Sequence, residues 1–228
     1  MGVARSTTTA SPTPTGVRKG PGALAVSNQT KNERPAPRAR LTPSALLALF
    51  VLGAAGGLVG DEGHVTSGTT RYISHALPFI WKSQLWFPLL VGGATCAVAQ
   101  LRVALPAPRY DGGFGEGAAA VAAVIGLYAL TALLRHDPLG PATALCYALA
   151  ALTAWHFADG PAALACGVMV AVVGPAAEIA LVAAGISEYT HGVDGLFGVA
   201  PWLPALYFAF GVVAARLGEL FAARSVIR

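Results

Sequence analysis

The stretch at residues 199–211, "VAPWLPALYFAFG", contains no charged residue and opens with a tryptophan between two prolines. Extended to about residue 222, it is long enough to cross the roughly 30 Å hydrocarbon core of a bilayer. We place Pro201 and Pro204 in the first turn of this helix, where a missing backbone N–H costs nothing because those donors have no partner inside the helix. The stretch therefore predicts a membrane helix whose start is marked by prolines.

The composition of the whole chain agrees with this prediction. Of its 228 residues, 55% are hydrophobic and 11% are charged, and the mean hydropathy is +0.60; a soluble domain carries about 25% charged residues. Five further apolar stretches have a length suited to crossing a bilayer: 42–60, 85–105, 117–134, 139–157 and 161–186. Residues 41–228 are therefore predicted to form one all-α membrane domain, a bundle of six transmembrane helices.

Residues 1–40 have a different character. They are rich in Ser, Thr, Pro, Lys and Arg and cannot bury a core, so we expect a disordered, basic N-terminal tail. Arginines also mark the other end of the chain, at Arg216, Arg224 and Arg228. The positive-inside rule then predicts that both termini are cytoplasmic, in the plasma membrane of a bacterium or the endoplasmic reticulum of a eukaryote. This topology accounts for the net charge of +4 without a nucleic-acid partner, and docking of the tail to anionic lipids is the alternative.

Glu178 is the acid expected deepest in the membrane, one turn after Gly174 and Pro175. An ionisable residue at such depth is costly and points to ligand binding, proton transfer or helix pairing. The structural alternative is a protonated glutamate bonded to a backbone carbonyl. Pro175 is expected to kink or locally open the span, which would leave backbone groups in need of polar partners. We predict that the hydroxyl of a lipid lies beside Glu178.

Other polar residues have plainer interpretations. The pairs His136 with Asp137 and His156 with Asp159 lie at span edges, where capping and turn roles are favoured over a catalytic dyad. Arg216 and Glu219, three residues apart, are expected to form an ion pair on the helix surface. The three cysteines, Cys96, Cys146 and Cys166, all fall in spans and are expected to be packing residues.

The sequence lacks the usual motifs of hydrolases, metalloproteases and nucleotide-binding proteins. We therefore predict a protein that is not an enzyme and that uses no cofactor and no metal. The alternative is an intramembrane enzyme that modifies a lipid, using Glu178 with His156 or His136.

Two spans carry small residues at spacings that allow close helix contacts. The first has Gly53, Gly56, Gly57 and Gly60, and the last has Gly211, Ala214, Ala215 and Gly218. Such spacing serves packing within one subunit or a homo-oligomer equally well. Between the first two spans, the loop "DEGHVTSGTTRYISHALPFIWKS" (61–83) contains an apolar run too short to cross the bilayer, so we expect this run to lie along the membrane interface.

Several stretches resemble one family in order and spacing. They are "WLPALYFAFGVVAARLGEL" in the last span, "AAGISEYTHG" before it, "QLWFPLLVGGATCAVA" in the second span and "LTAWHFADG" at the end of the fourth. Together they resemble the Insig family, six-helix proteins of the endoplasmic reticulum that bind oxysterols and retain the sterol-sensing protein Scap. The resemblance covers roughly residues 42–225, and the Ala-rich, short-loop style suggests a bacterial homologue.

The resemblance implies an intramembrane cavity for a lipid, which we take to be a sterol or a diacylglycerol-like molecule. Two departures put Scap-type partnering and oxysterol specificity in doubt. The family's aspartate after Trp-x-Phe corresponds to Ala158 here, with Asp159 displaced by one, and its span-four glutamine falls near Pro141. The candidate lipid-binding residues are Glu178, Pro175, Trp86, Pro88, Tyr128, Tyr147, Trp155 and Phe208.

Overall fold

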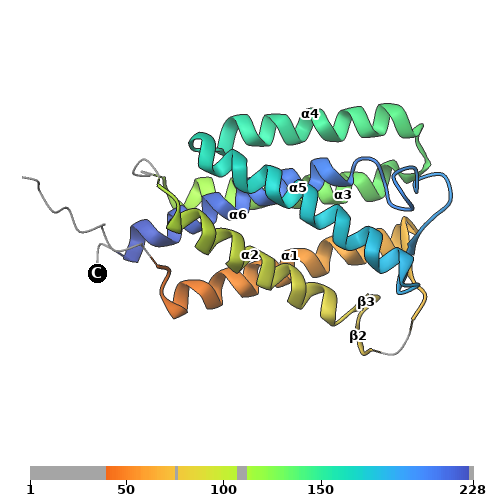
Figure 1. Cartoon of the computed structure of the whole chain (residues 1–228), viewed down its shortest axis with the longest axis horizontal. Coiled ribbons are helices and arrows are strands. Elements are labelled where there is room, and N and C mark those ends of the chain that lie inside the picture. The colour runs from red at the N-terminus through yellow and green to blue at the C-terminus, as the bar shows by residue number, and fades with distance from the viewer. Residues whose placement is uncertain (1–39, 75–76, 107–111, 226–228) are drawn as a thin grey trace, which may run out of the picture. The chain divides into compact units, whose positions relative to one another are not determined.

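A computed structural model describes residues 40–74, 77–106 and 112–225 of the chain. Six long helices make up most of this part (Figure 1). They are α1 (Pro43–Ser67), α2 (Trp86–Ala104), α3 (Phe114–Leu133), α4 (Leu139–Phe157), α5 (Gly160–Ala183) and α6 (Leu203–Ser225). The predicted all-α bundle of six helices is confirmed. The predicted N-terminal tail, residues 1–40, lies outside the described residues except for Arg40.

Five of these helices are long and apolar enough to cross a membrane, as judged by length and composition. The exception is α4, whose bounds match the predicted span 139–157. Pro141, Trp155 and His156 lower the apolar character of this 19-residue helix. It packs beside α3 and α6, and these contacts hold it in the bundle.

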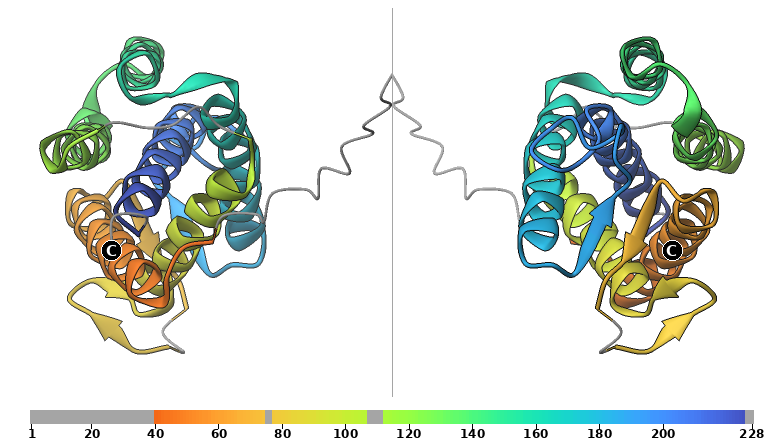
Figure 2. Two further views of the ribbon diagram at one scale, coloured as in Figure 1. Left: turned by 90° about the vertical axis from the view of Figure 1, so that its left-hand side faces the viewer. Right: turned by 90° about the vertical axis from the view of Figure 1, so that its right-hand side faces the viewer.

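Helix α6 is the centre of the bundle. The two end-on views show it surrounded by the other helices (Figure 2). Nearly all of its residues from Leu203 to Leu220 are buried or half-buried, and they contribute to each of the three apolar clusters of the core. Pro204 lies in its first turn as predicted, whereas Pro201 lies in the turn before the helix.

The small residues of α6 serve packing inside this chain. A Cβ atom at Gly218 would lie 2.6 Å from the carbonyl oxygen of Ala99 on α2. A Cβ atom at Gly211 would lie 2.9 Å from the carbonyl oxygen of Cys166 on α5. Only glycine allows such close approach of two helix backbones. These two positions therefore seat α2 and α5 directly on the central helix.

The predicted surface ion pair between Arg216 and Glu219 is buried instead. Both side chains lie inside the bundle near the end of α6, with Nη1 of Arg216 3.0 Å from Oε2 of Glu219. Arg102, fully buried on α2, pairs with Glu219 as well, and Arg216 also reaches Glu116 (2.6 Å) and Asp159 (3.6 Å). The prediction was wrong because the spacing along one helix does not reveal that neighbouring helices cover it on all sides.

Short strands lie at the opposite end of the bundle (Figure 1). β1 (Thr70–Tyr72) pairs antiparallel with β4 (Ser187–Tyr189), with Thr70 opposite Tyr189, and β2 (Phe79–Ile80) pairs with β3 (Ser83–Gln84). A 3₁₀ turn, η1 (Leu134–His136), joins α3 to α4 at this end. The apolar run of the first loop thus forms a hairpin, and its turn residue Trp81 is exposed.

Two helices differ from their predicted spans in ways that shape the interior. α1 continues past the predicted end at residue 60 as far as Ser67, so Asp61 and His64 belong to the helix. Both side chains are buried. α5 is helical without interruption on both sides of Pro175, so the expected local opening of the span does not occur.

Candidate functional site: a cavity inside the bundle

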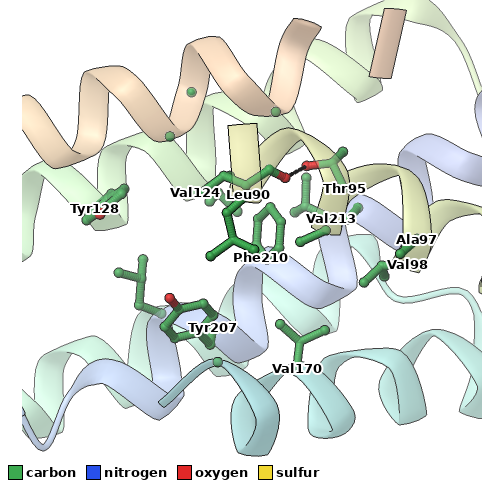
Figure 3. A pocket seen from close by; sticks show the side chains of 18 of the residues that line it. Leu90, Thr95, Ala97, Val98, Val124, Tyr128, Val170, Tyr207, Phe210 and Val213 are labelled. Carbon is green, nitrogen blue, oxygen red and sulfur yellow. Dashed lines mark hydrogen bonds between the residues drawn. The ribbon is translucent and has the colours of Figure 1, made fainter. Parts of the chain in front are cut away.

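A cavity of about 340 Å³ lies between α1, α2, α3, α5 and α6 (Figure 3). Most of its wall is aliphatic or aromatic, as the side chains of Leu90, Val98, Val124, Val170, Phe210 and Val213 illustrate. Its volume falls in the range of small-molecule sites, which are about 300–1,000 Å³ and mostly apolar. The cavity is therefore suited to an apolar ligand such as a lipid chain or ring system.

One end of this cavity is polar. Tyr207 on α6 donates a hydrogen bond to Glu178 on α5, with 3.0 Å between the phenol oxygen and Oε1. Tyr128 on α3 lies toward the same end of the cavity as Tyr207, whereas Ala97 and Val98 lie toward the other end (Figure 3). A ligand with a polar head and an apolar body would match this division.

Gly174 makes room for the tyrosine that bonds Glu178. A Cβ atom at Gly174 would overlap the aromatic ring of Tyr207. Gly174 lies one helical turn before Glu178, on the same face of α5, so the ring can pass over it and reach the carboxyl group. The Gly-x-x-x-Glu spacing thus positions the hydrogen bond at the polar end of the cavity.

A second, smaller hollow of about 20 Å³ adjoins this end, and we call it the polar pocket. Glu178, Tyr128 and Phe87 line both the cavity and the polar pocket. The other lining residues are Asp61, His64, Thr70, Arg71, Tyr72, Trp86, Ser187 and Tyr189. The paired strands β1 and β4 contribute five of these, so the small sheet forms one wall of the polar pocket.

Hydrogen bonds fix several polar side chains around this pocket. The phenol of Tyr72 donates to Oδ2 of Asp61 at 2.6 Å, and Nε2 of His64 lies 2.8 Å from Oγ1 of Thr131. Burial, and next the Asp61 carboxylate, raise the pKa of Tyr72 above its usual range. Burial, and next Glu178, raise the pKa of Tyr189 in the same way. Both phenols therefore remain protonated hydrogen-bond donors at physiological pH.

The predicted lipid-binding residues separate into two groups. Glu178 and Tyr128 line the cavity and the polar pocket, and Trp86 lines the polar pocket. The remaining five, which do not line either hollow, are Pro175, Pro88, Tyr147, Trp155 and Phe208. Pro175 and Pro88 are buried in their helices, Phe208 packs in the core, Tyr147 is exposed on α4, and Trp155 is 89% exposed.

The histidines of the enzymatic alternative lie away from Glu178. His136 ends η1 and His156 lies in the last turn of α4, both are exposed, and neither lines the cavity or the polar pocket. The histidine that shares a pocket with Glu178 is His64. Its hydrogen bond to Thr131 and its edge-on contact with the ring of Tyr128 give it a packing role.

Sequence reasoning missed Asp61, His64 and Tyr207. Asp61 and His64 are three residues apart, the spacing that places two side chains on one face of a helix. Hydropathy alone hides this signal, because it falls after residue 60, where the charged residues Asp61 and Glu62 begin. Tyr207 was visible in the opening stretch, but only the fold shows that it faces α5.

The cavity also opens toward the outside of the bundle between α2 and α5. Several residues line it and are exposed as well, including Leu90 (53%) on α2 and Val173 (61%) on α5. Both helices are candidate membrane spans, so this opening faces the lipid phase.

Comparison with known proteins gives a close relative. No family model matches the chain. An "INSIG protein homolog" from Mycolicibacterium vanbaalenii is 55% identical over 185 residues, which is 81% of this chain and 90% of the relative. The crystal structure of the mycobacterial Insig homolog MvINS from Mycobacterium vanbaalenii superposes with a TM-score of 0.79 at 54% identity, over 81% of this chain and 97% of the other.

A second crystal structure, of a cross-linked MvINS trimer with a cysteine substitution, matches with a TM-score of 0.79 and 53% identity, again over 81% and 97% of the two chains. The helices and their internal cavity define an integral membrane protein, a six-helix bundle with a mostly apolar cavity between its helices. At this identity and coverage, the chain belongs to the Insig family. The predicted family resemblance is thus confirmed.

Proposed function

We propose that this Insig-family protein holds one membrane lipid with a hydroxyl-bearing head in the cavity and does not transform it. The lipid class is a sterol or a diacylglycerol-like molecule. Its apolar body lies against the aliphatic wall, and its hydroxyl lies beside Glu178 and Tyr128.

The observation that carries this proposal is the distribution of polar atoms in the cavity. A long, mostly apolar wall leads to a polar end, where Glu178 and Tyr207 bond each other. Thr95 also lines the wall, but its hydroxyl donates to the carbonyl oxygen of Val91 in its own helix. A half-buried carboxyl at the end of an apolar cavity needs hydrogen-bond partners, and a lipid hydroxyl supplies one more. The opening between α2 and α5 supports the same conclusion, since a bilayer lipid can reach the cavity through it.

Absence of turnover distinguishes this proposal from the enzymatic alternative. Purified protein is incubated with a radiolabelled diacylglycerol and, separately, with a radiolabelled cholesterol, and the bound fraction and all products are separated by chromatography. Stoichiometric retention of unchanged lipid is expected. A product that forms repeatedly, and that disappears with Glu178→Gln, would favour a lipid-modifying enzyme instead.

We further propose that the protein is a homo-oligomer with both termini in the cytoplasm. The cross-linked trimer of MvINS supports self-association in this family. A bacterial relative at 55% identity supports a plasma-membrane location. A Scap-like partner remains outside the proposal, because Asp159 engages Arg216 within the chain and Ala158 takes the place of the family's aspartate.

A further inference from the structure

The polar pocket adjoins the end of the cavity where Glu178 lies. It shares the side chains of Phe87, Tyr128 and Glu178 with the cavity, so these three form the boundary between the two. On the far side of that boundary, β1 and β4 close the end of the bundle through their antiparallel pairing. A group that passes the boundary therefore meets the polar side chains of Asp61, Tyr72 and Tyr189.

The size of the polar pocket limits what enters. Its free volume is about 20 Å³. A site needs roughly 10–15 Å³ of such volume to hold one water molecule. One hydroxyl-sized group fits, whereas a phosphate with its ester substituent is several times larger. The geometry thus favours a head group that ends in a single hydroxyl.

The charged side chains around the polar pocket also favour an uncharged head group. Two carboxyl groups line it, those of Asp61 and Glu178. A carboxyl accepts hydrogen bonds when ionised and gains a donor when protonated, and it carries positive charge in neither form. Arg71 is the one lysine or arginine among the described lining residues, and its guanidinium is paired with Glu188. A buried anionic head would therefore lack a compensating cation, which is costly.

One residue of the lining also carries a hydroxyl without a partner. The hydroxyl of Thr70 is buried and makes no hydrogen bond within the described part of the chain. Buried polar groups are nearly always bonded, so an orphaned one calls for an explanation. A ligand hydroxyl in the polar pocket would supply the missing partner. Tyr72 and Tyr189 add phenol groups to the same wall.

We propose that the polar pocket is a head-group site that admits one uncharged hydroxyl and excludes phosphate-bearing heads. This inference rests on the proposed lipid-binding function and restricts it to neutral lipids with a small hydroxyl head. It also sets the orientation of the ligand, with its head under the β1–β4 sheet and its apolar body toward the buried Arg102–Glu219 pair.

The test compares two probes that differ only in the head. The full-length protein in detergent is titrated with a fluorescent diacylglycerol and with a phosphatidic acid that carries the same labelled acyl chains. The diacylglycerol is expected to bind at least tenfold more tightly. Asp61→Asn keeps the side-chain shape but removes a possible negative charge, and it should narrow this difference.

Thr70→Val tests the orphaned hydroxyl. Valine has nearly the same shape, and the hydroxyl has no partner without ligand, so thermal stability should not fall. Affinity for the diacylglycerol should fall about two- to tenfold, the equivalent of one lost hydrogen bond. The matched control is Thr153→Val, a buried threonine on α4 that bonds its own helix and should not change affinity.

The outcomes separate the two proposals. If neither probe binds and a fluorescent sterol is not retained either, the lipid-binding function itself is rejected, and the head-group site with it. If only the sterol is retained, the lipid-binding function stands, and the head-group site is overturned unless Thr70→Val lowers the affinity for the sterol. If both probes bind with equal affinity, or if Thr70→Val and Asp61→Asn leave both affinities unchanged, the cavity still binds lipid and only the head-group site is overturned.

Discussion

The phenol of Tyr207 and the carboxyl of Glu178 join α6 to α5 by a 3.0 Å hydrogen bond at the polar end of the cavity. The bond holds the acid at the boundary with the polar pocket. Both members of the pair lie in membrane spans, where an unpaired polar group is expensive. The arrangement explains how the bundle tolerates a glutamate at this depth and keeps it available to a ligand.

Replacement of Glu178 tests this role. Glu178→Leu is expected to lower lipid retention by roughly tenfold at most, because one hydrogen bond is worth about 0.5–1.5 kcal/mol. Glu178→Gln preserves an acceptor for Tyr207 and should retain more lipid than the leucine variant. Exchange of a fluorescent diacylglycerol or sterol measures the lipid retention of both variants. Since Glu178→Leu leaves Tyr207 unpaired, Glu178→Leu with Tyr207→Phe serves as the control for folding. Unchanged affinity in a folded variant would make Glu178 a structural acid.

Gly174 gives a second prediction. Gly174→Ala places a methyl group where the ring of Tyr207 lies, so the ring must move and the bond to Glu178 is lost or weakened. Lipid retention and the melting temperature are both expected to fall. The control is Gly93→Ala on α2, where an added Cβ meets no atom within 4 Å. If the two variants melt and bind alike, Gly174 is not required for the position of Tyr207.

The buried ion pairs at the far end of the bundle should matter for stability. Arg102→Met leaves Glu219 buried with one cation fewer, and loss of one partner of a buried pair costs about 3–5 kcal/mol. Arg102→Met with Glu219→Gln should recover part of this loss, because it removes the uncompensated charge. Arg71→Met breaks an exposed pair with Glu188 and should change stability little. Thermal melting in detergent compares the variants, and equal melting of Arg102→Met and wild type would contradict the prediction.

The fold was predictable from sequence because apolar length is a strong signal. The bounds of α4 were predicted to the residue, and those of α2 within one. Much of the site was not predictable, for a physical reason. β1 and β4 have three residues each and are separated by more than a hundred positions, so no local pattern marks their pairing. Nor does a pattern along one helix show which of its polar residues neighbouring helices will bury, as Asp61 illustrates.

Orientation in the membrane is a further prediction. Cysteines placed at Ser6 and Ser225 should react with a membrane-impermeant maleimide from the cytoplasmic side only, because lysine and arginine are concentrated at both ends of the chain. Asp137→Cys, at the opposite end of the bundle beside η1, should react from the other side only. The three native cysteines are replaced by alanine in this background. Labelling of Ser6→Cys or Ser225→Cys from the outside would reject the orientation.

Native mass spectrometry of the purified full-length protein shows whether a lipid occupies the cavity. We expect one retained lipid per chain, and fragmentation of the complex should identify an uncharged molecule with a small hydroxyl head. Glu178→Leu should lower the occupied fraction while the mass of the bound lipid stays the same. A protein that carries no lipid after mild extraction, and takes up neither a diacylglycerol nor a sterol when these are supplied, would contradict the claim that the cavity is a lipid-binding site.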